Sequence, residues 1–432
     1  MSTRRRFVLL LALAVAGAIA YVLHVSDVLS SRTSSLNNWP PQLGQDRLSG
    51  SETPQYDQHV TAGRLQQSNA NKVFDIFSEV LVVSRPSRVD RRATMERLRL
   101  ALGIHWTYVD AVSYDEPGIQ ALLDCVRSVR RRTRSRSFKW PPEHELQLLL
   151  RAAWGLSTTK SSLVLGSRCF YSAQSSLSKV IDPSWGTFFA ESRLSGLSFA
   201  TPLLPTVSAG TGEPMTCATK NHVHGVKFEP WLLPHRVLTP AKVACWYSHL
   251  VAIHLVAQYD AVEALARDVN PLENYSEAFL ILEDDIDMEQ TISQELRAIW
   301  GLLPPDWDIV FLGHCWSNES YHPALMAQGR PSLEVQGVGV HPSFAPKCTH
   351  AYAINPASAR RLLLYLSYPL FAYSRPFDQA LAWLVQDKQV KAFSVVPSIV
   401  VQHKVSGSDI DQGAGGTGSK WRDHLKHSVL GL

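Results

Sequence analysis

The sequence has little cysteine and little net charge. Its 432 residues include only 6 cysteines, so it is not a disulfide scaffold, and its fold must rest on an apolar core. The net charge of +4 is small, and much of the basic character is local. We interpret the local basic run as a solvated, mobile surface segment rather than a nucleic-acid or lipid site; it comprises Arg127, Arg130, Arg131, Arg132, Arg134 and Arg136. We find no internal repeat.

The N-terminus carries a hydrophobic segment. Residues 4–6 are arginines, and the uncharged apolar run 7–25 that follows is long enough to span a bilayer. The basic flank favours a cytoplasmic tail (1–6) and a lumenal remainder, which makes a single-pass type II membrane protein. The alternative is a cleaved signal peptide with its site at 18–20, but the apolar run continues beyond that site. Under either topology the lumenal location argues against nucleic acid as a partner.

The rest of the chain divides into two regions. Residues 26–72 are rich in Ser, Gln, Asn and Pro, which predicts a disordered stem. Residues 73–432 suit one large domain with a variable insert at 113–235. Strands are expected at 79–83, 106–109, 278–282, 308–312, 349–354 and 395–401. Helices are expected at 90–102 (capped by Asp90), 143–154, 241–258, 292–303 (with a capping box, Thr291 to Gln294), 356–366 and 376–385. This alternation predicts an α/β fold with a mainly parallel sheet.

Three acidic residues follow a buried strand. The apolar run 278–282 leads directly into Glu283, Asp284 and Asp285. Ligands of open α/β sheets bind beyond the carboxyl ends of the strands. Adjacent carboxylates repel and together need a cation or a proton. Oxygen ligands select a hard divalent ion, Mn²⁺ or Mg²⁺, so we favour a metal site over the alternative, an acidic turn before the next helix.

Five segments in order resemble a known family, glycosyltransferase family 25, which contains lipopolysaccharide and collagen galactosyltransferases. The likeness is to a fungal-type, type II membrane member. In this chain the second segment has Ala241, Lys242 and Ala244 where the family has Gly, Glu and Gly. The segments are 82–92, 238–249, 280–285, 306–313, and 348–354 together with 376–378.

The resemblance implies a GT-A-like nucleotide-sugar-binding fold and a Golgi or endoplasmic-reticulum hexosyltransferase. The implied reaction is metal-dependent and inverting, and it transfers galactose from UDP-galactose to a glycan or glycoprotein. Two other classes of function remain as alternatives. One is a metal-dependent phosphohydrolase, although we find no set of separate Asp- and His-rich motifs. The other is a non-catalytic sugar-binding protein on the same fold.

The resemblance and the chemistry together assign roles to single residues. A divalent ion at Glu283, Asp284 and Asp285 would bridge the donor diphosphate, with His403 as a further ligand. An inverting reaction needs a carboxylate base, and Asp378 is the candidate because a helix start keeps it ionised. The alternatives are a packing role for His403 and a helix N-cap role for Asp378.

Donor binding is assigned to residues of two segments. Ser84, Arg85 and Arg88 lie at the end of the first strand and just after it, and the side chains of Arg85, Arg88 and Arg92 can face a diphosphate. Ser248 and His249 are expected to line the donor site through the resemblance. The alternative for the arginines is a solvated basic helix start. The alternative for Ser248 and His249 is a buried polar pair that supports the sheet. In an oxidising lumen we further expect Cys315 and Cys348 to form a disulfide, because both flank strand-like segments at the same nominal end of the sheet.

Overall fold

The computed structural model describes residues 72–147, 213–259, 277–326, 337–403 and 425–431. All of them belong to one compact unit, Ser68–Leu432. The expected tail, membrane span and stem (to residue 71) lie outside the described residues, as do residues 148–212 of the insert. The expected helix 143–154 is helical over its described part, 143–147. Within the described ranges, no helix is long and apolar enough to cross a membrane.

A seven-stranded sheet forms the centre of the fold, with the order β2-β1-β3-β7-β5-β8-β6. β1 is parallel to β2 and β3, and β5 is parallel to β8. β7 is antiparallel to both β3 and β5, and β6 is antiparallel to β8. The strands are β1 (Phe77–Ser84), β2 (Thr107–Asp110), β3 (Ala278–Glu283), β5 (Ile309–Cys315), β6 (Gly339–Pro342), β7 (Lys347–Ile354) and β8 (Ala392–Val396).

The α/β class is therefore confirmed, but the sheet is mixed rather than mainly parallel. An apolar run in the sequence shows that a strand is buried on both faces, and it does not show which way the strand runs. β7 inserts in reverse between β3 and β5, two strands that precede it in the chain. Its N-terminal end consequently lies at the carboxyl edge of β3 and β5.

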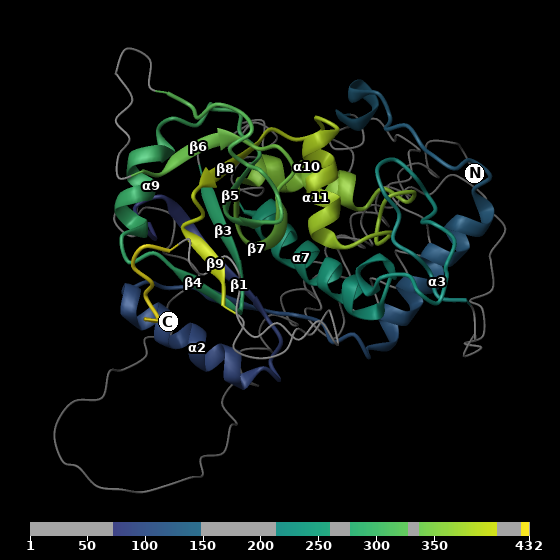
Figure 1. Ribbon diagram of the computed structural model, residues 1–432, viewed down its shortest axis with the longest axis horizontal. Coiled ribbons are helices and arrows are strands. Elements are labelled where there is room, and N and C mark those ends of the chain that lie inside the picture. Colours follow the sequence, from purple (N-terminus) through teal and green to yellow (C-terminus); the bar gives the residue numbers. More distant parts are fainter. Residues whose placement is uncertain (1–71, 148–212, 260–276, 327–336, 404–424, 432) are drawn as a thin grey trace, which may run out of the picture. The chain divides into compact units, whose positions relative to one another are not determined.

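Helices cover both faces of the sheet. On β3, Phe279 and Ile281 face a core shared with α3, α7, α10 and α11, while Leu280 and Leu282 face a second core shared with α2 and α9. Figure 1 shows α2 and α9 on one side of the strands and α7, α10 and α11 on the other. The helices are α2 (Val89–Leu102), α3 (Pro117–Arg132), the short 3₁₀ helix η2 (Pro234–Arg236), α7 (Pro240–Gln258), α9 (Ile292–Trp300), α10 (Pro356–Leu366) and α11 (Phe377–Gln386).

Two expected helix caps are wrong. α2 begins one residue before Asp90, which lies in its first turn and pairs with Arg88 at 3.1 Å. At the start of α9, the side chain of Thr291 makes no capping bond and donates instead to the carboxylate of Glu295 at 3.1 Å. In both places the side chain pairs with a neighbouring charged side chain, and the start of the helix has no side-chain capping bond.

The expected strand 395–401 is two strands in different sheets. β8 ends at Val396 in the main sheet, and β9 (Val400–Gln402) pairs with β4 (Ile286–Met288) in a separate two-stranded sheet. Pro397 lies at the break, where proline has no N–H to donate to a strand ladder. Because β4 follows the acidic residues directly, this small sheet brings the end of β9 to their edge.

Candidate functional site

The acidic residues lie at the carboxyl edge of two parallel strands. β1 and β3 pair with Val83 opposite Glu283, so Ser84 ends next to Asp284. The hydroxyl of Ser84 donates to Oδ2 of Asp284 at 2.8 Å, and both residues are buried. Asp285 continues along the same edge. The apolar run of β3 predicts that these carboxylates lie at the carboxyl end of a buried strand, and the structure confirms this position.

A single arginine nitrogen lies between the two aspartates. Nη1 of Arg91 is 2.8 Å from Oδ1 of Asp284 and 3.3 Å from Oδ2 of Asp285. Burial lowers the pKa of Arg91, but the charges of Asp285 and Asp284 outweigh it and raise the pKa above its ordinary value. Repulsion between these acids predicts a cation, and Arg91 was not among the residues expected to supply it. Its position in the first turn of α2, where a cation opposes the helix dipole, is the sequence signal that points to it.

Glu283 belongs to a different network on the other side of the strand. It accepts hydrogen bonds from Nε2 of His249 at 3.3 Å and from the hydroxyl of Thr349 at 2.9 Å. Burial would raise the pKa of Glu283, but the hydrogen bond and charge of His249, the charge of His350 and the Thr349 hydrogen bond lower it to about 2. Glu283 is therefore held ionised by protein groups, and its role as a metal ligand stays a prediction.

The two α7 residues expected in the donor site lie inside the molecule. The ring of His249 stacks on Phe377 with a centroid distance of 4.5 Å, and its Nδ1 lies 3.1 Å from the hydroxyl of Tyr352. Ser248 donates to the carbonyl of Ala244 and accepts from the backbone of the loop after β2. Both are buried polar groups that fix α7 against the sheet, and their contact with a donor stays a prediction.

Asp378 is the second residue of α11 and does not cap it. The N-cap is Pro376, and the carboxylate of Asp378 accepts from the backbone N–H of Gln379 at 2.7 Å and of Cys348 at 3.3 Å. Burial raises the pKa of Asp378 above its ordinary value, and the charge of Glu283 raises it further, while the two N–H bonds lower it. The two carboxylates are thus close enough to influence each other across β7.

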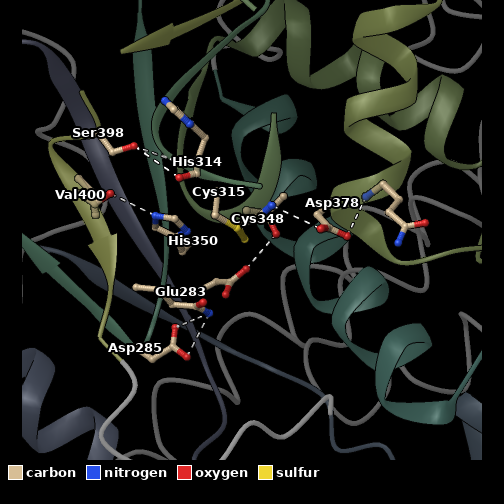
Figure 2. The surroundings of a disulfide bond; sticks show 12 residues. Glu283, Asp285, His314, Cys315, Cys348, His350, Asp378, Ser398 and Val400 are labelled. Atoms are coloured by element: carbon tan, nitrogen blue, oxygen red, sulfur yellow. Dashed lines mark hydrogen bonds between the residues drawn. A yellow bond between two sulfur atoms is a disulfide. The ribbon is translucent and has the colours of Figure 1, made fainter. Parts of the chain in front are cut away.

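A disulfide lies between these carboxylates. The expected Cys315–Cys348 pair is confirmed, with a Cα–Cα distance of 5.7 Å that is well within the range of a disulfide. Figure 2 shows Cys348 between Asp378 and Glu283, with Asp285 beyond Glu283. The bond joins the end of β5 to the beginning of β7 at the residue that holds Asp378.

The basic residues after β1 point to different partners. Arg88 makes two hydrogen bonds to Asp90, both at 3.1 Å. Arg85 donates to the hydroxyl of Ser113 at 3.1 Å. Arg92 bridges the end of β1 to the end of β2 (Asp110). The donor contacts of Arg85 and Arg88 stay predictions.

His403 follows β9 and contacts Asp285 at the carboxyl edge of the sheet through its backbone. Its backbone N–H donates to the carbonyl of Asp285, and the amide of Gln402 approaches both carboxylate oxygens of Asp285 at 3.4 and 3.5 Å. In the part of the chain that the structure describes, no group of three or more His, Cys, Asp or Glu side chains is arranged around one point. A role for the His403 ring as a metal ligand stays a prediction.

Gly313, in the fourth family-like segment, leaves room for a contact between His350 of β7 and Val400 of β9. A side chain there would collide with the ring of His350 and the carbonyl of Val400. Without it, Nε2 of His350 lies 3.1 Å from that carbonyl, a bond drawn in Figure 2. Because this position of β5 has no side chain, the ring of His350 on β7 can reach across it to the backbone of β9.

No protein-family model matches this sequence, and a search of curated proteins finds no match either. The family resemblance consequently rests on the five ordered segments alone. The described structure brings the third and fifth of these segments together at one edge of the sheet, with the first contributing Ser84 and Arg91.

Proposed function

We propose that this protein is a glycosyltransferase of the family 25 type, on a GT-A-like nucleotide-sugar-binding fold. It transfers galactose from UDP-galactose to a glycan or glycoprotein. The observation that carries the proposal is the convergence of Asp284 and Asp285 on one cationic nitrogen at the carboxyl edge of β3. Ligands of α/β sheets bind at that edge, and the first turn of α2 beside it suits a diphosphate.

The two aspartates fit a divalent cation. Their oxygens already meet at a single positive charge, Nη1 of Arg91, so the chain directs two hard anionic ligands at one point. Mg²⁺ in nucleotide sites is typically held by one or two carboxylates together with substrate phosphates and water. Mn²⁺ or Mg²⁺ bound by Asp284 and Asp285 would neutralise the charge that develops on the diphosphate leaving group.

The remaining carboxylates have distinct tasks in this proposal. Asp378 takes the proton from the acceptor hydroxyl, and its raised pKa brings it nearer to the range that suits a general base. Glu283, ionised and held by His249 and Thr349, keeps the carboxyl edge negative and fixes β7 against β3. Inversion requires the acceptor to attack from the side opposite the diphosphate, and Asp378 comes from a different element, α11, than the aspartates.

The N-terminal sequence sets the proposed location. With residues 7–25 as a signal anchor, the domain would face the lumen of the Golgi or endoplasmic reticulum, where nucleotide sugars and glycoprotein acceptors meet. The confirmed disulfide between Cys315 and Cys348 agrees with an oxidising compartment.

The test is donor consumption by the full chain in detergent, with a panel of radiolabelled nucleotide sugars and MnCl₂. We expect UDP-galactose to be hydrolysed or transferred, and EDTA or Asp284→Asn to abolish this. Asp124→Asn, which removes a carboxylate paired with Arg127 on α3, serves as the matched control and should stay active. Consumption of phosphate esters instead of nucleotide sugars, or glycan binding without turnover, would contradict the proposal.

A further inference from the structure

Arg91 occupies an unfavourable place on its helix. It lies in the first turn of α2, where the helix dipole disfavours a positive charge. Helix stability therefore does not explain an arginine there. Its contacts do, because Nη1 reaches both Asp284 and Asp285.

The three charges are shielded from solvent. The side chains of Arg91, Asp284 and Asp285 are 12%, 9% and 8% exposed. A buried ion pair is costly to break from one side, because the partner is left as an uncompensated charge. Without Arg91, the two adjacent carboxylates would lose the cation that the described residues place between them at a poorly solvated edge. Whatever enters between them must bring positive charge of its own.

We propose that Arg91 is an internal counter-cation, which holds the place of the divalent cation until that cation binds and then pairs with the diphosphate of the donor. The same carboxylate oxygens cannot keep close contact with both cations, so metal binding releases the guanidinium. Its planar set of donors matches phosphate oxygens in a bidentate manner. The second half of this inference rests on the proposed function, and the first half does not.

The inference predicts effects of opposite sign for one substitution. In Arg91→Met the competitor of the metal is gone, so Mn²⁺ alone should bind more tightly. With Mn²⁺ saturating, UDP should bind more weakly because a phosphate ligand is lost. Arg91→Lys keeps the positive charge but not the bidentate geometry, so it should leave Mn²⁺ affinity within about threefold and still weaken UDP.

The experiment is calorimetric titration of the full chain in detergent with MnCl₂, and then with UDP at saturating MnCl₂. We expect Arg91→Met to lower the Kd for Mn²⁺ about tenfold and to raise the Kd for UDP about tenfold, each equivalent to about 1.4 kcal/mol. Arg97→Met is the matched control, since Arg97 is an exposed arginine of the same helix and should change neither constant. The increase in Tm on adding MnCl₂ should be larger for Arg91→Met than for the natural chain, which tests the inference even if the variant folds poorly.

Unchanged or weaker Mn²⁺ binding in Arg91→Met would overturn the inference, as would absence of Mn²⁺ binding in every variant. Tighter Mn²⁺ binding with unchanged UDP binding would remove the diphosphate step. The outcome is separable from the proposed function. Sugar transfer with unaltered Mn²⁺ affinity would refute the counter-cation alone, whereas altered Mn²⁺ affinity without any sugar transfer would refute the transferase alone.

Discussion

The backbone N–H of Cys348 donates to Oδ2 of Asp378 at 3.3 Å, so the disulfide to Cys315 is tied directly to the candidate base. Cys348 has φ of 65°, a left-handed backbone conformation that non-glycine residues rarely adopt. Such conformations persist where the surrounding structure enforces them, and they cluster at functional sites. The next residue, Thr349, bonds to Glu283, so one segment of β7 holds both carboxylates.

Asp378→Asn should reduce sugar transfer by about 10²–10⁴-fold, because an amide cannot take the acceptor proton. The affinity for UDP with Mn²⁺ should be unchanged. An amide can accept from only one of the two backbone N–H groups of Cys348 and Gln379, so unfolding free energy should also fall by about 1 kcal/mol. Initial rates, UDP titration and thermal melting separate these effects.

A loss of stability with normal transfer would show that Asp378 is structural. Asp287 would be a poor replacement as the base. It is buried, and it accepts backbone bonds from Met288 at 2.8 Å and from Leu430 at 3.2 Å, which fix the C-terminal segment.

Removing the disulfide should weaken the fold and move the pH dependence of transfer. Cys315→Ala with Cys348→Ala opens a loop with a sequence separation of 33, for which chain entropy predicts a loss of about 3–4 kcal/mol. If Cys348 then no longer holds Asp378, the pKa-lowering N–H bond is lost, and the acid limb of the rate profile should shift to higher pH. Denaturant unfolding and a pH–rate profile measure the two effects. Cys217→Ala, which removes a buried free cysteine, is the control and should not move the acid limb.

Glu283 should make stability depend on acid pH. Its pKa is lowered in the folded protein from an ordinary value of 4.5 to about 2, so its contribution is fully present above about pH 4.5 and is lost as the pH falls toward 2. The contribution is on the order of 3 kcal/mol. Glu283→Gln should lose most of it at neutral pH and should flatten the unfolding free energy between pH 5 and pH 2 relative to the natural chain. An equally steep profile in the variant would show that other carboxylates carry the dependence.

Replacing each of two neighbouring arginines of α3 should change the unfolding free energy by very different amounts. Arg130 is buried and donates to the carbonyls of Thr216 at 2.9 Å and Ser374 at 3.1 Å, and burial lowers its pKa to about 10. Arg130→Ala removes a donor from both buried carbonyls, of which that of Ser374 keeps its bond from the N–H of Ala218, and should cost about 2–4 kcal/mol. Arg131→Ala, at an exposed position, should stay within about 0.5 kcal/mol. Equal melting temperatures for the two variants would contradict this prediction.

Arg130 also shows where sequence reasoning was wrong. The basic run was expected to be a solvated, mobile segment, but Arg130 lies on the buried face of α3. From sequence alone, a run of like charges suggests that every member is exposed to solvent. Once the run forms an amphipathic helix, position on the helix decides which charge is buried.

The sequence by itself determined the α/β class, most strand and helix positions and the place of the acidic residues at a strand end. These depend on local periodicity and on the order of residues along one chain. Tertiary structure alone decided the direction of β7, the division of the last strand at Pro397, and the partners of the acidic residues. Arg91 and Asp284 are far apart in the sequence, and so are Cys348 and Asp378. The first contact follows from the pairing of β1 with β3 and the second from the packing of α11 against β7, and no local pattern encodes either.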